Sequence, residues 1–242
     1  MKKYLFLLLF SIVACQKESK LIWKDVSYKN SSSIVLEAGI QTEAHFIVPT
    51  FEPSGELGDL MNEYFLNESA EILGFEISKD ATFDTLGNHF VSSYEKIHKA
   101  LPTDVTPWEA KFQGKVLDLN KIYHTVLEYY VFSGGTSVEE GIRSAFFDKS
   151  SQKRIEVSEL FLNYKGFEQM VEKKFVEQFG NYTSEEFFFE KNQFKVSKNI
   201  YIKNDAFVVS YASGEIAPMY KGTFDVKIPK QQIQSLINPI YF

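Results

Sequence analysis

The sequence contains a single cysteine, Cys15, in 242 residues. One thiol can form no intramolecular disulfide and no multi-cysteine zinc cluster, so packing alone must stabilise the fold. Beyond the N-terminal segment there is no second long apolar run, no internal repeat and no low-complexity tract. The roughly 225 residues that follow this segment are enough for one large domain or two small ones.

The common catalytic signatures are missing as well. The chain has no Gly-x-Ser-x-Gly elbow, no Walker loop and no dinucleotide-binding glycine pattern. None of its four histidines (His45, His89, His98 and His124) lies four residues from another, which excludes a zinc-binding helix with that spacing. Each histidine is predicted to be a hydrogen-bonded polar group in a strand or helix. We therefore predict no metal, no cofactor and no catalytic residue.

Basic residues are fewer than acidic ones, 26 against 32, which gives a net charge of −6. If residues 1–14 are removed, Lys2 and Lys3 are lost and the net charge becomes −8. An acidic protein is a poor partner for a phosphate backbone, so nucleic-acid binding is not expected. The acidity favours solubility and also suits a basic partner.

The N-terminus resembles a bacterial lipoprotein signal. Lys2 and Lys3 precede an apolar run from Tyr4 to Val13, which is too short for a bilayer span of ~20 residues but suits a secretory signal. The sequence "IVAC" that follows resembles a lipobox, whose cysteine is lipidated and becomes the first residue. We predict a signal peptide at 1–14 and a lipidated Cys15 followed by a linker, together residues 15–22.

The tether after Cys15 gives a weaker sorting signal. Gln16 is not aspartate, so the inner-membrane retention signal of some bacterial lipoproteins is absent. The Gln-Lys-acidic sequence partly matches a surface-export signal of Bacteroidetes lipoproteins. The expected location is the outer membrane, on its periplasmic face or at the cell surface, with membrane contact through the lipid.

The pattern of apolar residues predicts an α+β fold with antiparallel sheets and clustered helices. Pro49 is expected to end the second strand, because proline cannot donate to a ladder. Strands are expected near residues 23–28, 34–48, 108–119, 121–132, 139–148, 198–202, 206–211 and 222–228, and helices near 57–73, 88–100, 165–179 and from 230. Two intimately packed subdomains are predicted, residues 23–132 and 133–242.

Two stretches stand out as candidate binding sites. In residues 129–148, Gly134 and Gly135 suit a tight turn with positive φ, next to the hydroxyl of Ser133. For this stretch taken alone, a simple hairpin connection is by far the favoured explanation. In residues 211–229, Pro218 and Gly222 bracket Tyr220 in a stiff segment, where a ring is a good contact anchor. A buried Tyr220 that closes the core is the alternative.

The order of motifs resembles a known pair of extracytoplasmic domains. The stretches "YYVFSGG" (129–135), "AFFD" (145–148), "EVSELF" (156–161) and "EIAPMYKG" (215–222) resemble the C-terminal domain of unknown function found in the anti-sigma factor RsiV. "FIVPTF" (46–51), before a helix containing Met61 and Asn62, resembles the domain that precedes the catalytic domain of the deacetylase PdaC. The second resemblance is the looser of the two.

The resemblance implies an exported α+β protein, often lipid-anchored. In RsiV the domain binds host lysozyme, which implies a basic lysozyme-like partner here and contacts through Ser133, Gly134, Gly135, Pro218 and Tyr220. Family members often have Gly-Gly-Ala-His where this chain reads Gly-Gly-Thr-Ser, so any role of that histidine is lost. The chain has neither the cytoplasmic segment of RsiV nor the metal-binding catalytic domain of PdaC.

The sequence therefore predicts a lipid-anchored envelope protein whose domain binds a muramidase-type protein or the peptidoglycan glycan and performs no chemistry. Two alternatives remain open. Two acids facing each other in an open groove, one with a raised pKa, would favour a carboxylate-dependent glycan hydrolase. A wholly buried Tyr220 and the absence of a pocket would favour a purely structural lipoprotein.

Overall fold

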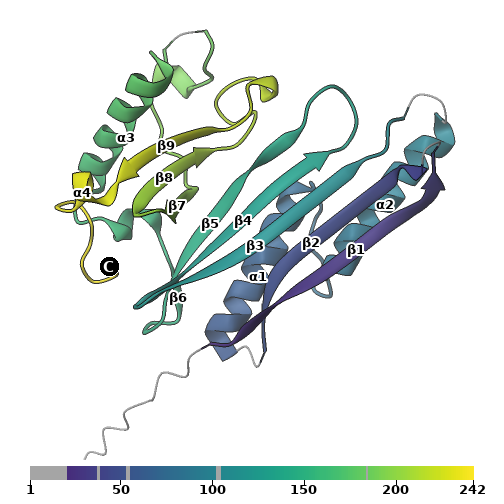
Figure 1. The fold of residues 1–242 in the computed structure, drawn as a ribbon, viewed down its shortest axis with the longest axis horizontal. Helices are drawn as coiled ribbons and strands as arrows, with labels where there is room; N and C mark the ends of the chain where they lie inside the picture. Colours follow the sequence, from purple (N-terminus) through teal and green to yellow (C-terminus); the bar gives the residue numbers. More distant parts are fainter. Residues whose placement is uncertain (1–20, 37–38, 53–54, 102–104, 184) are drawn as a thin grey trace, which may run out of the picture.

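A mixed sheet of six strands, in the order β1-β2-β3-β4-β5-β6, crosses most of the molecule (Figure 1). The computed structural model describes residues 21–36, 39–52, 55–101, 105–183 and 185–242. The six strands span Trp23–Val35, Gln41–Phe51, Glu109–Leu119, Ile122–Phe132, Glu139–Asp148 and Lys153–Ile155. Cys15 and the expected signal peptide lie outside the described residues.

The predicted α+β fold is confirmed, with one departure inside the large sheet. Strands β2 and β3 pair in parallel, whereas the other neighbours in this sheet are antiparallel. Helices α1 (Gly55–Ile72) and α2 (Phe83–Ala100) lie between β2 and β3 in the chain. They provide the long crossover that a parallel pair requires, so the expectation of antiparallel sheets is wrong at this pair.

The expectation that Pro49 ends its strand is also wrong, because Pro49 lies inside β2, opposite Asp25 of β1. The ladder between β2 and β3 ends two residues earlier, at the pair Ile47 and Gln113. At Gly114 a Cβ atom would lie 2.6 Å from Cδ of Pro49, so the proline ring occupies the space where a side chain would stand. A proline is tolerated where the ladder has already ended.

Helices α1 and α2 cover one face of the large sheet (Figure 1). The core beneath them, which we call the helix-side core, contains Phe46, Phe65 and Phe112, all nearly inaccessible to solvent. Helix α2 begins five residues before the expected residue 88, because Thr82 and Thr85 form a capping box: each side chain accepts a hydrogen bond from the other's backbone amide. Gly74, at φ +70°, stops the turn after α1 as predicted.

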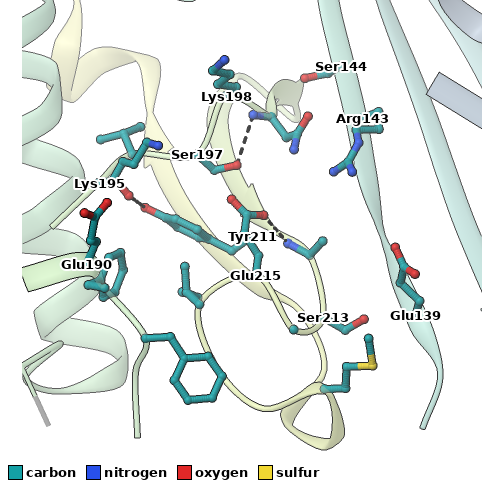
Figure 2. Close-up of a pocket in the computed structure, with 18 of the residues that line it drawn as sticks. Glu139, Arg143, Ser144, Glu190, Lys195, Ser197, Lys198, Tyr211, Ser213 and Glu215 are labelled. Atoms are coloured by element: carbon teal, nitrogen blue, oxygen red, sulfur yellow. Dashed lines mark hydrogen bonds between the residues drawn. The ribbon is translucent and has the colours of Figure 1, made fainter. Parts of the chain in front are cut away.

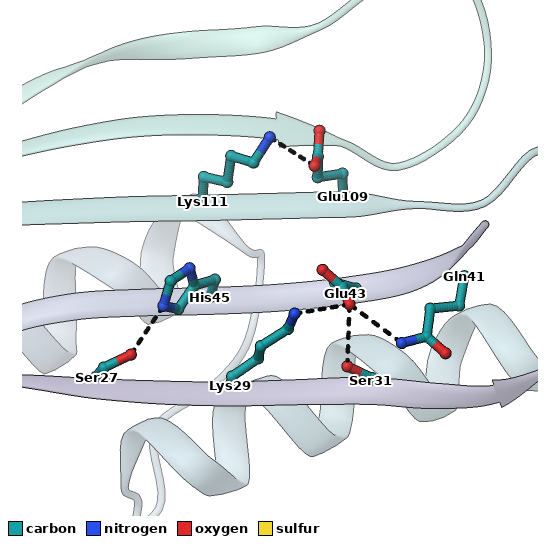
Figure 3. A network of polar contacts seen from close by, with 8 residues as sticks. All are labelled: Ser27, Lys29, Ser31, Gln41, Glu43, His45, Glu109 and Lys111. Atoms are coloured by element: carbon teal, nitrogen blue, oxygen red, sulfur yellow. Dashed lines mark hydrogen bonds and ion pairs between the residues drawn. The ribbon is translucent and has the colours of Figure 1, made fainter. Parts of the chain in front are cut away.

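The opposite face of strands β1 to β3 is polar (Figure 3). The carboxylate of Glu43 accepts from Ser31 and Gln41 and pairs with Lys29 at 2.9 Å, and the pKa of Glu43 is lowered by these donors, Lys29 first. His45 shares a 2.8 Å hydrogen bond with Ser27. Buried rings on one face and paired polar groups on the other give the alternation expected of a half-covered sheet.

The C-terminal unit is a second, three-stranded antiparallel sheet covered by α3 (Tyr164–Phe179). Its strands are β7 (Ile200–Lys203), β8 (Ala206–Tyr211) and β9 (Phe224–Pro229). The short helices η2 (Val157–Leu160), η3 (Glu190–Asn192), η4 (Met219–Lys221) and α4 (Lys230–Ile233) connect and end the unit.

Strand β8 is buried along its whole length because both of its faces are covered. Phe207 and Val209 pack with Phe167 and Phe175 of α3 in what we call the C-terminal core. Val208 points the other way and packs against Val126 of β4. The small sheet therefore lies between α3 and the large sheet.

Strands β4 and β5 contribute to both cores. Tyr123 and Phe147 face the helix-side core, whereas the neighbouring Ile122 and Phe146 face the C-terminal core. The expected boundary between residues 132 and 133 falls between β4 and β5, which pair with each other over ten residue pairs. One sheet thus spans that boundary.

His124 is completely buried on the side of β4 that faces the C-terminal core. Its ring stacks on Phe146, with 4.3 Å between centroids and 6° between planes. Neither ring nitrogen has a hydrogen-bond partner among the described residues. The prediction that every histidine is a satisfied polar group is therefore wrong for His124, whose position in the strand aims the ring at apolar neighbours.

Among the described residues, no helix is both long enough and apolar enough to cross a membrane.

Candidate functional site

A cleft of about 1040 Å³ lies at the outer edge of β5, between α1 and the C-terminal unit (Figure 2). Its first wall is formed by residues of α1, β4, β5 and β6, and its second wall by the segment 188–199. The loop 211–219, which follows β8, lies between the two walls. The cleft thus lies between the large sheet, the C-terminal unit and helix α1, which packs on the large sheet.

The loop after β8 is fixed to the start of β5. The backbone amide of Ser213 donates to the carbonyl of Glu140 at 2.9 Å, and the amide of Glu140 donates to Oγ of Ser213 at 2.8 Å. Glu215 holds the loop's own geometry, because its carboxylate accepts from the amide of Ala212 at 2.8 Å. Gly141 is required beside it, since a Cβ there would lie 2.7 Å from Cβ of Ala212.

The first wall carries an arginine among three carboxylates. Nε of Arg143 lies 3.4 Å from Oε2 of Glu68, and one Nη lies 3.9 Å from Oε1 of Glu71. The guanidinium also lies over the ring of Tyr129, 5.6 Å from its centroid. Glu139, four residues before Arg143 on β5, projects from the same side of the strand (Figure 2).

Burial controls the ionisation of this wall. Desolvation raises the pKa of both Glu68 and Glu139, and the positive charge of Arg143 opposes that rise in each case. Desolvation also raises the pKa of Tyr129 to about 12. The Tyr129 hydroxyl has no hydrogen-bond partner among the described residues, so this wall holds polar groups that its own side chains leave unsatisfied.

The second wall mixes aromatic side chains with three lysines and one glutamate. Lys195 and Lys198 line it, and the hydroxyl of Tyr211 donates to the carbonyl of Lys195 at 3.0 Å (Figure 2). Desolvation raises the pKa of Tyr211, which therefore remains a neutral donor. Oγ of Ser197 accepts from the amide of Asn199 at 3.2 Å, which fixes the turn that enters β7.

The structure does not bring the first predicted stretch into this cleft. Gly134 and Gly135 do adopt positive φ, 94° and 83°, as predicted for a tight turn. A Cβ at Gly134 would lie 3.2 Å from Nε1 of Trp108, and Ser133 is exposed. The turn therefore packs beside the start of β3, and none of Ser133, Gly134 and Gly135 lines the cleft.

The second predicted stretch does lie at the cleft mouth. Pro218 precedes η4, and Gly222 follows it at φ +72°. Tyr220, at the centre of η4, is 79% exposed, which excludes the buried alternative. Its neighbour Met219 is 42% exposed and lines the cleft.

A second segment joins Met219 at this mouth. Phe188 is 56% exposed and also lines the cleft, and its amide donates to the carbonyl of Ile216 at 2.8 Å. Lys221 pairs with Glu186 at 2.7 Å and ties η4 to the same segment. We call the three exposed apolar side chains, Phe188, Met219 and Tyr220, the apolar lip.

Sequence reasoning missed Arg143 and Glu139. Glu139 and Glu140 are neighbours on a strand and so face opposite sides, and only Glu139 of the two lines the cleft. The alternation of β5 could have placed Glu139 and Arg143 on one face, but no pattern links them to Glu68. Within the described residues, no three His, Cys, Asp or Glu side chains come together as a metal site.

Comparison with known families gives one match. Residues 158–231 match the family described as "Protein of unknown function (DUF3298)". No curated protein matches the chain. The match supports the expectation of a domain of unknown function in the C-terminal half, and it says nothing of the RsiV-like or PdaC-like properties.

Two solved structures share the fold over nearly the whole chain. A DUF3298 family protein from Pseudomonas aeruginosa PAO1 has a TM-score of 0.62 at 14% identity, covering 93% of this chain and 98% of its own. A member of the same family from Bacteroides fragilis NCTC 9343 has a TM-score of 0.67 at 13% identity, covering 91% of this chain and 95% of its own. The two sheets are therefore common to these proteins.

Proposed function

We propose that the chain is a lipid-anchored protein of the cell envelope whose domain binds a ligand without chemistry. The observation that carries the proposal is the apolar lip: Phe188 and Met219 are exposed and line a polar cleft, and Tyr220, next to Met219 in the chain, is 79% exposed. Such groups of exposed apolar residues with a polar surround are typical of interaction sites.

The lip is built to hold its side chains in place. Tyr220 lies in a single 3₁₀ turn that begins after Pro218 and ends at Gly222. A ring presented from a stiff turn loses little conformational entropy on binding, and tyrosine offers both apolar area and a hydroxyl. Phe188 is fixed by its backbone hydrogen bond to Ile216. These features favour a contact surface over a core position.

The proposed partner is a basic protein of the muramidase type. The resemblance to the RsiV domain supports this partner, and the acidic net charge would steer a basic protein toward the domain. A cell-wall glycan stacked on the same rings is the other ligand of this proposal. Binding measurements with a basic lysozyme and with purified peptidoglycan distinguish the two.

Replacing Tyr220 by alanine is expected to weaken binding of a basic lysozyme at least tenfold. The physical reason is the loss of a central aromatic anchor, for which truncation costs about 2 kcal/mol or more. The measurement is surface plasmon resonance with the full chain immobilised. Tyr220→Phe should keep most of the affinity, because it retains the ring.

Leu162→Ala is the matched control, because Leu162 is 66% exposed and belongs to neither the lip nor the cleft. This variant should bind like the parent. Equal binding by folded Tyr220→Ala and the parent would remove Tyr220 as an anchor. Absence of binding by the parent to both lysozyme and peptidoglycan would remove the proposal.

The lipid anchor is tested by replacing Cys15 with serine. The expected result is that labelled fatty acid attaches to the parent and not to Cys15→Ser, and that the variant moves from the membrane fraction to the soluble fraction. Three acyl chains give firm attachment, whereas a polar linker gives none. A Cys15→Ser protein that stays with membranes would contradict the proposed location.

One observation favours the hydrolase alternative: Glu68 and Glu139 line the same cleft and both have a raised pKa. Against it, Arg143 pairs with Glu68 and leaves Glu139 as the one carboxyl suited to act as an acid. Release of soluble fragments from peptidoglycan by the full chain would decide for the hydrolase. A buried Tyr220 without a pocket would have favoured the structural alternative, whereas Tyr220 is exposed and lies beside a cleft.

A further inference from the structure

The outer edge of β5, on the side away from β4, has no strand partner between Glu140 and Phe146 among the described residues. At one end, both the amide and the carbonyl of Glu140 bond to Ser213. At the other end, β6 pairs with β5 from Phe146 to Asp148. The segment 141–145 between them pairs with β4 on its inner side only.

The alternation of the ladder shows which backbone groups face outward. The register with β4 is regular from Ile122–Asp148 to Val131–Glu139, without a bulge. Because Glu140 directs both backbone groups away from β4, Ile142 and Ser144 direct theirs the same way. In the described part of the chain, nothing hydrogen-bonds to these four groups. They are a short, open strand edge.

This edge opens into the cleft. Arg143 and Ser144 line it directly, and residues 195–199 of the second wall lie across the space (Figure 2). A cleft of about 1040 Å³ has room for a peptide of several residues in extended conformation. Ser213 already bonds to both outward backbone groups of the neighbouring Glu140, its amide as donor to the carbonyl and its hydroxyl oxygen as acceptor from the amide. The edge therefore accepts hydrogen-bond partners from this side.

The charges of the first wall indicate the side chain that such a peptide carries. Arg143 is already engaged by Glu68 and Glu71. Glu139 projects from the same face of β5, and within the described residues it has no ion pair. Arg154 also lines this wall, where it acts on Glu68 and lies over the ring of Tyr64. Glu139 is therefore the carboxylate of this wall that a basic side chain would complement.

We propose that the cleft binds an extended peptide segment bearing a lysine or arginine, which adds as a strand to β5 and pairs with Glu139. The peptide backbone would occupy the outward groups of Ile142 and Ser144. Its basic side chain would lie on the α1 side of the sheet. This inference does not rest on the apolar lip, because none of Ile142, Ser144 and Glu139 belongs to the lip.

The test uses the full chain and a fluorescein-labelled peptide, Ac-Thr-Lys-Val-Lys-Thr-amide, whose lysines fall on one face of a strand. Fluorescence anisotropy should show saturable binding, with at least tenfold weaker binding of the peptide in which both lysines are glutamate. N-methylation of alternate peptide amides should weaken binding to a similar extent. Hydrogen exchange of the Ile142 and Ser144 amides should slow when the lysine peptide is added.

Ile142→Pro removes the outward amide without touching the ladder to β4, and Ile142→Val is its matched control. The proline variant should bind at least tenfold more weakly than the valine variant. Glu139→Gln should bind several-fold more weakly than Glu128→Gln, whose carboxylate pairs with Lys115 outside the cleft.

Three outcomes would overturn the proposal: no saturable binding of the lysine peptide, equal binding by the proline and valine variants, or unchanged exchange at Ile142 and Ser144. If Ile142→Pro does not fold, hydrogen exchange of the parent and the pair Glu139→Gln and Glu128→Gln decide the matter. A failure of this test with intact lysozyme binding at Tyr220 would leave the proposed function in place.

Discussion

Replacing Phe175 by alanine is expected to lower the free energy of unfolding by about 3–5 kcal/mol. Phe175 is completely buried at the centre of the C-terminal core. Six other rings have centroids within 6.5 Å of its own: Phe179, Phe187, Phe189, Phe194, Tyr211 and Phe224. Truncation leaves a cavity that rings fixed on separate segments cannot fill by relaxing.

The effect should extend to the other core. Both tryptophans, Trp23 and Trp108, pack against the helix-side core, so their fluorescence reports its unfolding. Phe146 and Phe147 are neighbours on β5 that face opposite cores, and loss of one core would expose the back of the strand that carries the other. We expect urea unfolding by tryptophan fluorescence and by far-ultraviolet circular dichroism to shift together in Phe175→Ala.

Phe179→Ala is the matched control on the same helix. Phe179 is half-buried and contacts Phe175 and Phe224, so its truncation should cost about 1–2 kcal/mol. A loss below about 1 kcal/mol for Phe175→Ala would contradict the view of a rigid aromatic core. A fluorescence transition that stays in place while the circular dichroism transition shifts would show that the two cores unfold independently.

The local elements followed directly from residue patterns. Strand β8 was expected at 206–211 and has those bounds. Its apolar run begins at Ala206, directly after a turn, and ends at Tyr211, directly before a loop of small residues. Helix α3 was expected from 165 and begins at Tyr164, capped by Asn163, whose side chain accepts from the amide of Gly166. Periodicity and capping depend on residues that are close together in the chain, so the sequence alone predicts them.

The candidate site depended on contacts that no local pattern contains. Glu68 and Arg143 are 75 positions apart and meet only because α1 packs on the face of the sheet from which Arg143 projects. The parallel pairing of β2 and β3 places α1 there, and that pairing was not foreseen. Tyr220 was identified because Pro218 and Gly222 stiffen the chain locally, yet whether it was buried required the position of the whole C-terminal unit.

The second large effect is expected at His124 on acidification. We expect the parent to lose about 3 kcal/mol of stability between pH 7 and pH 4 that a His124→Leu variant does not lose. The measurement is the free energy of unfolding in urea at both pH values. The ring is completely buried, and neither nitrogen has a partner in the described part of the chain, so a charge there is uncompensated.

The direction of this pH dependence follows from the pKa of the His124 ring in the folded and unfolded states. Burial lowers the pKa of His124 to about 3 in the folded protein, whereas an unfolded chain has a histidine pKa of about 6.5. Between these values the unfolded state binds a proton that the folded state does not bind. Stability is therefore fully present above about pH 6.5 and falls by about 1.4 kcal/mol for each pH unit below it, down to about pH 3.

Two further variants separate charge from polarity. His124→Gln cannot titrate but keeps a buried polar group. It should be no more stable than the parent at pH 7, and it should lack the additional loss of stability that the parent shows on acidification. His45→Gln, which alters a hydrogen-bonded histidine on the polar face, should keep the parent's full acid loss. Equal acid loss in the parent and in His124→Leu would mean that the buried ring gains a proton at little cost, which requires water or a shifted strand beside Phe146.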